Sequence, residues 1–226
     1  MGSHSGILPW AWISKYLKAK ATFGGFSLSN QRNKVREKTS WDDDWLVKEC
    51  IRGNPEAQKA LFDRFAARMM GVCFRYVHNR ADAEDIVQDG FIKVFHSLQQ
   101  FQSRGSLEGW IRRIMVNTAL NFLNKNKRLM QSLRTEDDFQ PEAPERADGA
   151  VHQQDLLQML QQLPEGYRTI INLYAIEGYS HKEIGAMLGI AEVTSRSQYS
   201  RGKELLLKIQ SHTERMRVPD PKEKGK

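Results

Sequence analysis

With 226 residues, of which 40% are hydrophobic and 27% charged, the chain has an ordinary soluble composition and room for one large domain or two small ones. Its longest apolar stretch, residues 7–13, contains a proline and is too short to cross a bilayer. The two cysteines form no C-x-x-C pair and the six histidines show no metal-ligand spacing, so we expect no metal, no cofactor and a reducing, cytoplasmic location.

The net charge of +7 is distributed unevenly along the chain. Residues 1–40 and 104–134 each carry a net charge of +6, whereas residues 135–150 carry −5. Two basic blocks separated by an acidic one predict two surfaces that face nucleic acid, joined by a self-repelling linker. For any single charge run, a solvated face is the simpler interpretation.

Residues 1–40 show no sustained helical period and predict a basic, mobile arm. Over residues 41–134, apolar side chains recur at steps of three and four, which predicts three amphipathic helices packed as one bundle. Asp82 is the expected N-cap of the second helix and Ser106 that of the third. A short polar loop, residues 101–105, joins these two helices.

Carboxylates cluster at the start of the second helix, at Asp82, Glu84, Asp85 and Asp89. Such a cluster could hold the metal of a DNA-processing nuclease, but no matching carboxylate or histidine group occurs elsewhere in the sequence. Acids are also favoured in a first helical turn by the helix dipole. An acidic, partly apolar helix is better interpreted as a docking face for another protein.

The third predicted helix carries polar residues opposite its apolar stripe, with Arg113, Asn117 and Asn121 at helical spacing. Amides and arginines can bind a nucleic-acid backbone and the edges of unstacked bases, and Trp110 could stack on a base. Trp110 also fits the apolar stripe, so spacing alone favours a place in the core.

Residues 135–150 hold two prolines and six acids and predict an extended linker. Helical spacing resumes in a second domain, residues 151–212, which a basic tail, 213–226, follows. Ser180 and Glu183 form a capping box at the start of a helix that ends at Gly189, and a further helix begins near Glu192. This pattern predicts a helix-turn-helix. The predicted fold is all-α, with two small helical domains joined by a flexible acidic linker.

Two stretches resemble one protein family. Residues 82–128 read DAEDIVQDGFIKVFHSLQQFQSRGSLEGWIRRIMVNTALNFLNKNKR, which resembles region 2 of bacterial sigma factors of the extracytoplasmic-function type. Residues 163–206 read LPEGYRTIINLYAIEGYSHKEIGAMLGIAEVTSRSQYSRGKELL, which resembles region 4 of the same family. The resemblance implies a non-enzymatic subunit of RNA polymerase that recognises promoters and directs transcription initiation.

The resemblance also implies roles for individual residues. Those implied to bind core RNA polymerase are Asp85, Gln88, Asp89, Phe91 and Phe95. Those implied to capture the melted minus-ten element of promoter DNA are Trp110, Arg113, Asn117 and Asn121. Those implied to contact the minus-thirty-five element are Arg168, Thr194, Arg196, Ser197, Gln198, Ser200, Arg201 and Lys203. An anti-sigma factor, often membrane-bound in this family, is a further expected partner.

Four positions depart from the family's habitual pattern. Gly185 and Gly202 stand where alanine is usual, and Ser195 where an apolar residue packs the reading helix. Gln198 stands where a basic residue is common, which moves the expected preference from a guanine edge towards an adenine edge.

From the residues alone, a second binding function stays open. The helix-turn-helix could belong to a dimeric regulator that occupies an operator without polymerase. A second basic helix before the linker favours instead a monomer that reads two different elements.

Overall fold

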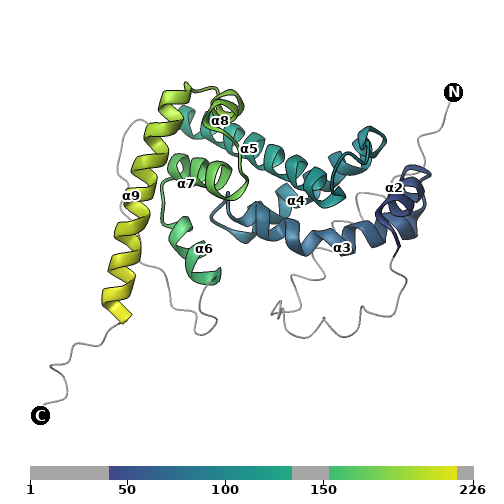
Figure 1. Cartoon of the computed structure of the whole chain (residues 1–226), viewed down its shortest axis with the longest axis horizontal. Coiled ribbons are helices and arrows are strands. Elements are labelled where there is room, and N and C mark those ends of the chain that lie inside the picture. Colours follow the sequence, from purple (N-terminus) through teal and green to yellow (C-terminus); the bar gives the residue numbers. More distant parts are fainter. Residues whose placement is uncertain (1–40, 134–152, 218–226) are drawn as a thin grey trace, which may run out of the picture. The chain divides into compact units, whose positions relative to one another are not determined.

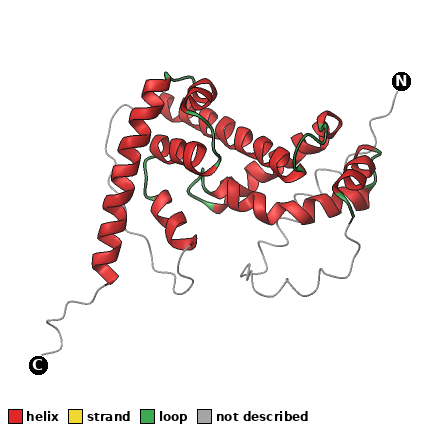
Figure 2. Ribbon diagram, viewed as in Figure 1, coloured by secondary structure: helices red, strands yellow, loops and turns green. Residues whose placement is uncertain are grey.

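The computed structural model describes residues 41–133 and 153–217, and every regular element within these ranges is helical (Figure 1, Figure 2). This confirms the all-α prediction. The predicted arm, the acidic linker and the last part of the basic tail lie outside the described residues. By its contacts the chain divides into two units, residues 1–74 with 79–123 and residues 75–78 with 124–226. Within the described ranges, none of the helices combines the length and the apolar character needed to cross a bilayer.

The elements of the first unit are α2 (Asp43–Ile51), α3 (Pro55–Phe74), α4 (Arg80–Ser97), the short helix η1 (Leu98–Gln100) and α5 (Leu107–Leu133), which continues beyond this unit. The prediction of three helices missed α2. The sequence contains a signal for the end of one helix and the start of another, a glycine followed by a proline. In the structure Gly53 adopts a positive φ of 80° after α2, and Pro55 begins α3. Between them, the Asn54 side chain accepts hydrogen bonds from the Glu56 and Ala57 amides.

The core of the first unit is a broad apolar layer to which all four long helices contribute. Side chains no more than 3% exposed come from α2 (Leu46), α3 (Leu61, Phe62, Phe65, Met69), α4 (Ile86, Val87, Phe91) and α5 (Leu107, Ile111, Met115). The Phe62 and Phe91 ring centroids lie 4.6 Å apart. At Gly90, a Cβ would overlap the thioether of Met115, so the missing side chain lets α4 and α5 pack closely. Burial of this kind is the main stabilising term in a small helical domain.

One of the two predicted N-caps is correct. The Ser106 hydroxyl accepts a hydrogen bond from the Gly109 amide at 3.1 Å, at the start of α5. Asp82, however, is not the cap of α4. Asn79 is the cap, with an extended backbone and a side chain that accepts from the Asp82 amide at 2.8 Å. The helix therefore begins at Arg80, and Asp82 lies in its first turn.

The second unit consists of α6 (Gln153–Gln161), α7 (Glu165–Ile171), the π-helical turn η2 (Asn172–Ile176), α8 (His181–Leu188) and α9 (Glu192–Arg217). Helix α9 contacts α6, α7 and α8. The buried apolar side chains of this unit include Ile170, Leu173 and Ile184 as well as a cluster of Leu160, Leu163 and Ile171, against which five partly buried side chains pack, namely Ile176, Tyr199, Leu205, Leu206 and Ile209.

The capping box and the turn of the helix-turn-helix are confirmed. Ser180 accepts from the Glu183 amide, and the Glu183 side chain accepts from the Ser180 amide at 2.8 Å. Gly189 ends α8 with a left-handed φ of 68°, and the Ile190 amide donates to the Gly185 carbonyl. Helix α9 begins three residues later.

Candidate nucleic-acid interfaces

One face of α5 is exposed and polar, and we call it the α5 face: Arg113, Asn117, Asn121 and the partly buried Trp110. Its backing is apolar, because Ile111, Met115 and Ala119 on the same helix are fully buried. The Trp110 ring lies 5.5 Å from that of Phe101, centroid to centroid. The structure thus brings the four predicted residues onto one helix, and Trp110 is neither fully in the core nor free of it.

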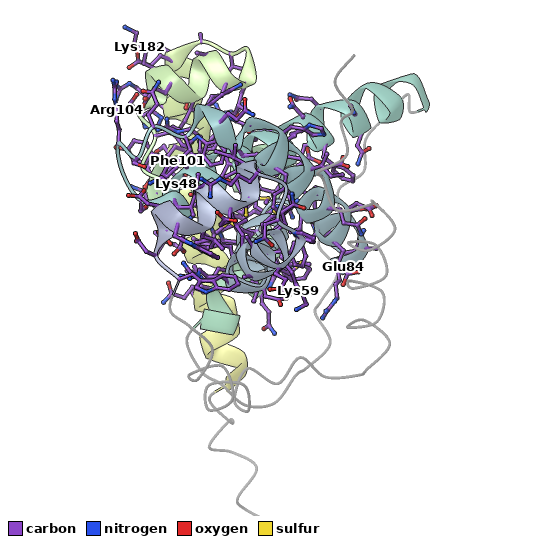
Figure 3. All side chains as sticks on the ribbon, turned by 90° about the vertical axis from the view of Figure 1, so that its right-hand side faces the viewer. Lys48, Lys59, Glu84, Phe101, Arg104 and Lys182 are labelled. Atoms are coloured by element: carbon purple, nitrogen blue, oxygen red, sulfur yellow. The ribbon has the colours of Figure 1, made fainter. Side chains whose placement is uncertain are left out.

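The loop 101–105, next to the α5 face in sequence, is fixed by a contact that the sequence did not indicate. Ser103 adopts a left-handed φ of 53°, and its hydroxyl donates to the Asp44 carboxylate on α2 at 3.0 Å. Arg104, which follows Ser103, projects outwards from the ribbon (Figure 3). The sequence shows a run of three acids at the start of α2, but nothing in it indicates that Ser103 is the partner of one of them.

The five residues that were predicted to bind polymerase lie on two different faces of α4. Asp85 and Asp89 are exposed and Gln88 is partly buried. Phe91 is 0% exposed and Phe95 9%, and their rings lie 6.2 Å apart in the apolar layer. These two rings therefore point into the interior of the bundle, on the face of α4 opposite the carboxylates, and in this structure they are not part of the exposed surface. Their spacing from Asp89 could not separate a docking face from a core face.

The carboxylates on α4 stand close enough to influence one another. Partial burial, together with the negative charges of Asp82, Asp89 and Glu84, raises the pKa of Asp85 above its usual value. Glu84 is paired with Arg80 at 2.8 Å. In the part of the chain that the structure describes, no group of three or more His, Cys, Asp or Glu residues is arranged to hold a metal ion.

The first half of α9 presents a second polar surface, which we call the α9 face. Arg196, Ser197, Ser200, Arg201 and Lys203 are exposed, and Thr194 and Gln198 are partly buried. Arg196 is folded back onto Glu192, with 2.6 Å between Nη2 and the carboxylate. Before the turn, Lys182 projects outwards from the start of α8 (Figure 3). Seven of the eight residues predicted for this surface are therefore on one helix.

Ser195 faces the other way and explains one departure from the family pattern. It is 0% exposed, and its hydroxyl lies 2.9 Å from Nδ1 of His181, which is itself 7% exposed. The His181 ring stacks on Tyr174 at 4.1 Å and meets the edge of Tyr199 at 5.7 Å. Burial, reinforced by the charge of Arg196, lowers the pKa of His181 below its usual value, and Glu192 acts in the opposite direction. A polar pair thus replaces an apolar contact between α8 and α9.

The two unusual glycines mark close approaches of the helices. A Cβ at Gly185 would lie 2.8 Å from the carbonyl oxygen of Ile190 in the turn. A Cβ at Gly202 would lie 3.0 Å from Tyr167 Cβ and from Ile171 Cδ1 on α7. Alanine, the usual residue at both positions, would therefore crowd the turn at position 185 and the contact between α9 and α7 at position 202.

Arg168 is the exception among the residues predicted to contact DNA. It is 0% exposed, and its guanidinium donates to the Tyr76 carbonyl at 3.2 Å and lies 2.9 Å from Nε2 of His78. Burial lowers the pKa of Arg168, and Glu165 opposes that shift. In this structure the arginine therefore joins α7 to the segment Arg75–His78, which belongs to the second unit, and presents no exposed side chain to DNA. Sequence alone did not reveal a partner about ninety residues away in the chain.

Comparison with known families gives two matches. Residues 61–129 match Sigma-70 region 2, and residues 153–206 match Sigma-70 region 4. The α5 face falls in the first match and the α9 face in the second.

Two curated proteins illustrate the similarity. The RNA polymerase sigma-H factor of Pseudomonas aeruginosa is 31% identical over 185 residues, which cover 74% of this chain and 93% of that protein. The ECF RNA polymerase sigma factor SigE of Mycolicibacterium smegmatis is 36% identical over 151 residues, covering 65% of this chain and 58% of that protein. Among solved structures, the sigma factor RpoE of Bartonella quintana, in complex with the anti-sigma factor NepR, is 22% identical with a TM-score of 0.47, covering 68% of this chain and 96% of that one.

Proposed function

The chain belongs to the sigma-70 family as a sigma factor of the extracytoplasmic-function type, and we propose that its α5 and α9 faces read the two promoter elements. As a sigma factor it binds core RNA polymerase, recognises promoter DNA and directs transcription initiation, and it is not an enzyme. The finer assignments below rest on the geometry of the described helices.

The α5 face is assigned to the melted minus-ten element. Arg113, Asn117 and Asn121 offer one guanidinium and two amides in a row, over a helix whose opposite side is fully buried. Unstacked bases expose polar edges that amides can hydrogen-bond, and an aromatic ring can stack on a base. Trp110 and Phe101 supply such rings beside the loop held by Asp44. Strand separation would then be driven by capture of the bases.

The α9 face is assigned to the minus-thirty-five element as double-stranded DNA. The second helix of a helix-turn-helix lies in the major groove with its first residues at the base edges. Thr194, Ser197, Ser200 and Lys203 supply phosphate and base-edge contacts, and the exposed Arg201 can reach guanine. Arg196 and Gln198 complete this set, whereas the buried Arg168 is left out of it.

The acidic side of α4 is assigned to core polymerase. Asp85, Gln88 and Asp89 form its accessible part, and Phe91 and Phe95 support it from the inside. We also propose that the chain acts in the cytoplasm. There an anti-sigma factor would regulate it by binding to it and covering these faces. The sigma factor RpoE of Bartonella quintana was solved in complex with such a partner, the anti-sigma factor NepR.

The observation that carries the residue assignments is the exposed row Arg113–Asn117–Asn121 over a buried stripe. The test is run-off transcription with sigma-free core polymerase and fragmented genomic DNA from the same source, with core alone as control. Transcripts that start at defined sites only when the chain is present give both promoter elements.

Variants then separate the surfaces. Alanine at Arg113, Asn117 and Asn121 together should abolish strand opening, seen by permanganate reactivity of melted thymines, while binding to core persists. The matched control replaces the exposed Gln99 and Gln100 of η1 by alanine. If the triple variant opens the promoter as well as this control does, the assignment of the α5 face is wrong.

A further inference from the structure

One exposed side chain at the start of α9, beside the α9 face, carries no polar group. Val193, the second residue of α9, is 75% exposed, more than the other large apolar side chains exposed in the described residues, such as Leu207 at 58%. Because the side chain is so exposed, it contributes little to the stability of this unit. An isolated exposed valine is unremarkable by itself, and its meaning comes from its place on the helix.

Val193 lies on the same side of α9 as the residues assigned to the minus-thirty-five element. Steps of three, four and seven or eight residues lead from it to Arg196, Ser197, and Ser200 with Arg201, all exposed. The opposite side is marked by the buried Ser195 and Gly202. Val193 is therefore the first residue of the row that would enter the groove.

The charges around Val193 are already matched. The carboxylate of Glu192, which precedes it, accepts two hydrogen bonds from Arg196, at 3.1 and 2.6 Å. The first turn of the helix therefore presents the valine side chain between a neutralised ion pair and the Thr194 side chain. The valine side chain itself can offer a groove partner only an apolar contact.

The major groove of DNA offers one such group, the C5 methyl of thymine. We propose that Val193 is a specificity-determining residue that packs against the methyl group of a thymine in the minus-thirty-five element. The residues at the start of a recognition helix are those that contact base edges, which places Val193 at the right depth. This inference rests on the proposed function, because it requires that α9 enters the major groove.

The test uses the promoter identified by run-off transcription and the complete holoenzyme. Each thymine of the minus-thirty-five element is replaced in turn by uracil, which lacks only the methyl group, and binding is measured for the wild type and for Val193→Ala. The matched control is Leu207→Ala, an exposed apolar residue further along the same helix. Circular dichroism checks that the variants fold.

For the wild type, one thymine should lose about three- to five-fold in affinity when its methyl group is removed, the value of one buried methyl group. Val193→Ala should bind the thymine template more weakly and be insensitive to uracil at that position, so the two changes are not additive. Leu207→Ala should retain the full uracil effect.

The inference is overturned if no uracil substitution weakens the wild type, if the element contains no thymine, or if Val193→Ala keeps the full uracil effect. Any of these results leaves transcription by the wild type intact. Failure of the proposed function looks different, because the chain would then start no specific transcripts at all.

Discussion

The two helices that we propose to face DNA are held in different ways. Helix α5 rests on a thick apolar layer, in which Ile111 and Met115 are completely buried. Helix α9 has apolar contacts through Tyr199, Leu205, Leu206 and Ile209, but it also approaches its neighbours closely at the glycines 185 and 202 and packs through the buried Ser195–His181 pair. The packing of α5 thus depends mainly on apolar side chains that fill space, whereas the packing of α9 also depends on the absence of a side chain at Gly185 and Gly202. We therefore expect the first unit to lose stability when atoms are removed from its apolar layer, and the second unit to lose stability when atoms are added at Gly185 or Gly202.

The largest effect should come from Phe91→Ala. The ring is fully buried between Phe62 and Phe95, and its removal leaves a cavity in the apolar layer. We expect the free energy of unfolding of the first unit to fall by about 3–5 kcal/mol. Urea denaturation followed by tryptophan fluorescence measures this, since Trp41, Trp45 and Trp110 lie in that unit.

Asp89→Asn is the matched control for Phe91→Ala, two residues away on the exposed side of α4. It should leave stability within about 0.5 kcal/mol of the wild type and weaken binding to core polymerase. If Phe91→Ala were as stable as this control, the ring would not be part of the core. That result would support the prediction that Phe91 binds core polymerase.

Adding one methyl group should be the next most damaging change, at Gly185→Ala. The new Cβ would lie 2.8 Å from the Ile190 carbonyl, a backbone atom that cannot move without shifting the start of α9. We expect a loss of about 1–2 kcal/mol in the second unit, because overpacking outweighs the better helix propensity of alanine. Faster hydrogen exchange in α8 and α9 would show it.

The same substitution at Gly71, in the interior of α3, should have the opposite sign. Nothing lies within 4 Å of a Cβ there, so Gly71→Ala should stabilise the first unit by about 0.5–1 kcal/mol. Equal effects at Gly71 and Gly185 would mean that the close approach of the Ile190 carbonyl does not determine the cost at position 185.

These glycines also show how far the sequence could predict the fold. Helical spacing, the capping box at Ser180 and the left-handed Gly189 are local signals, and the structure confirmed them. The unusual Gly185 and Gly202 were visible as departures, but their cause is an approach by other elements, which a one-dimensional pattern does not contain. Helix α2 was missed although the Gly53–Pro55 signal for its end was present.

The candidate sites were predictable where a polar residue stands on an exposed helix face. Arg113, Asn117 and Asn121 are such residues. The burial of Phe91 and Arg168 was not predictable, since apolar or basic character at helical spacing does not distinguish a surface position from an interior one. Asp44 lies far in sequence from Ser103, and only the packing of α2 brings them together.

A smaller effect is expected in the loop of the first unit. Asp44→Ala removes the acceptor that holds Ser103, and because this bond is exposed we expect a loss of about 0.5–1 kcal/mol, or two- to five-fold in promoter opening. Asp43→Ala is the control, since Asp43 pairs with Arg64 instead. Permanganate reactivity should fall for the first variant and not for the second, while minus-thirty-five binding is unchanged in both. Equal losses in opening would mean that the loop does not depend on Asp44.

The smallest expected effect is a pH dependence of the second unit. Burial lowers the pKa of His181, so the folded unit prefers the neutral ring while the unfolded chain titrates at its ordinary value of 6.5. The unfolded state therefore binds more protons as the pH falls through that value, and the second unit loses stability below it. Hydrogen exchange in α8 and α9, compared between about pH 7.5 and about pH 5.5, should accelerate after the intrinsic pH effect on exchange is removed.

His181→Gln separates this titration from the other ionisable groups near the ring. Glutamine cannot titrate, and it can still hydrogen-bond the Ser195 hydroxyl, whereas Glu192 and Arg196 are left in place. The variant should therefore lose the pH response of α8 and α9 and keep most of the stability at neutral pH. If wild type and variant respond equally, the response comes from another group, and the polar pair acts on α9 only as a packing contact. The contrast with α5 then rests on the glycines alone, because that helix has no buried titratable group between residues 107 and 126.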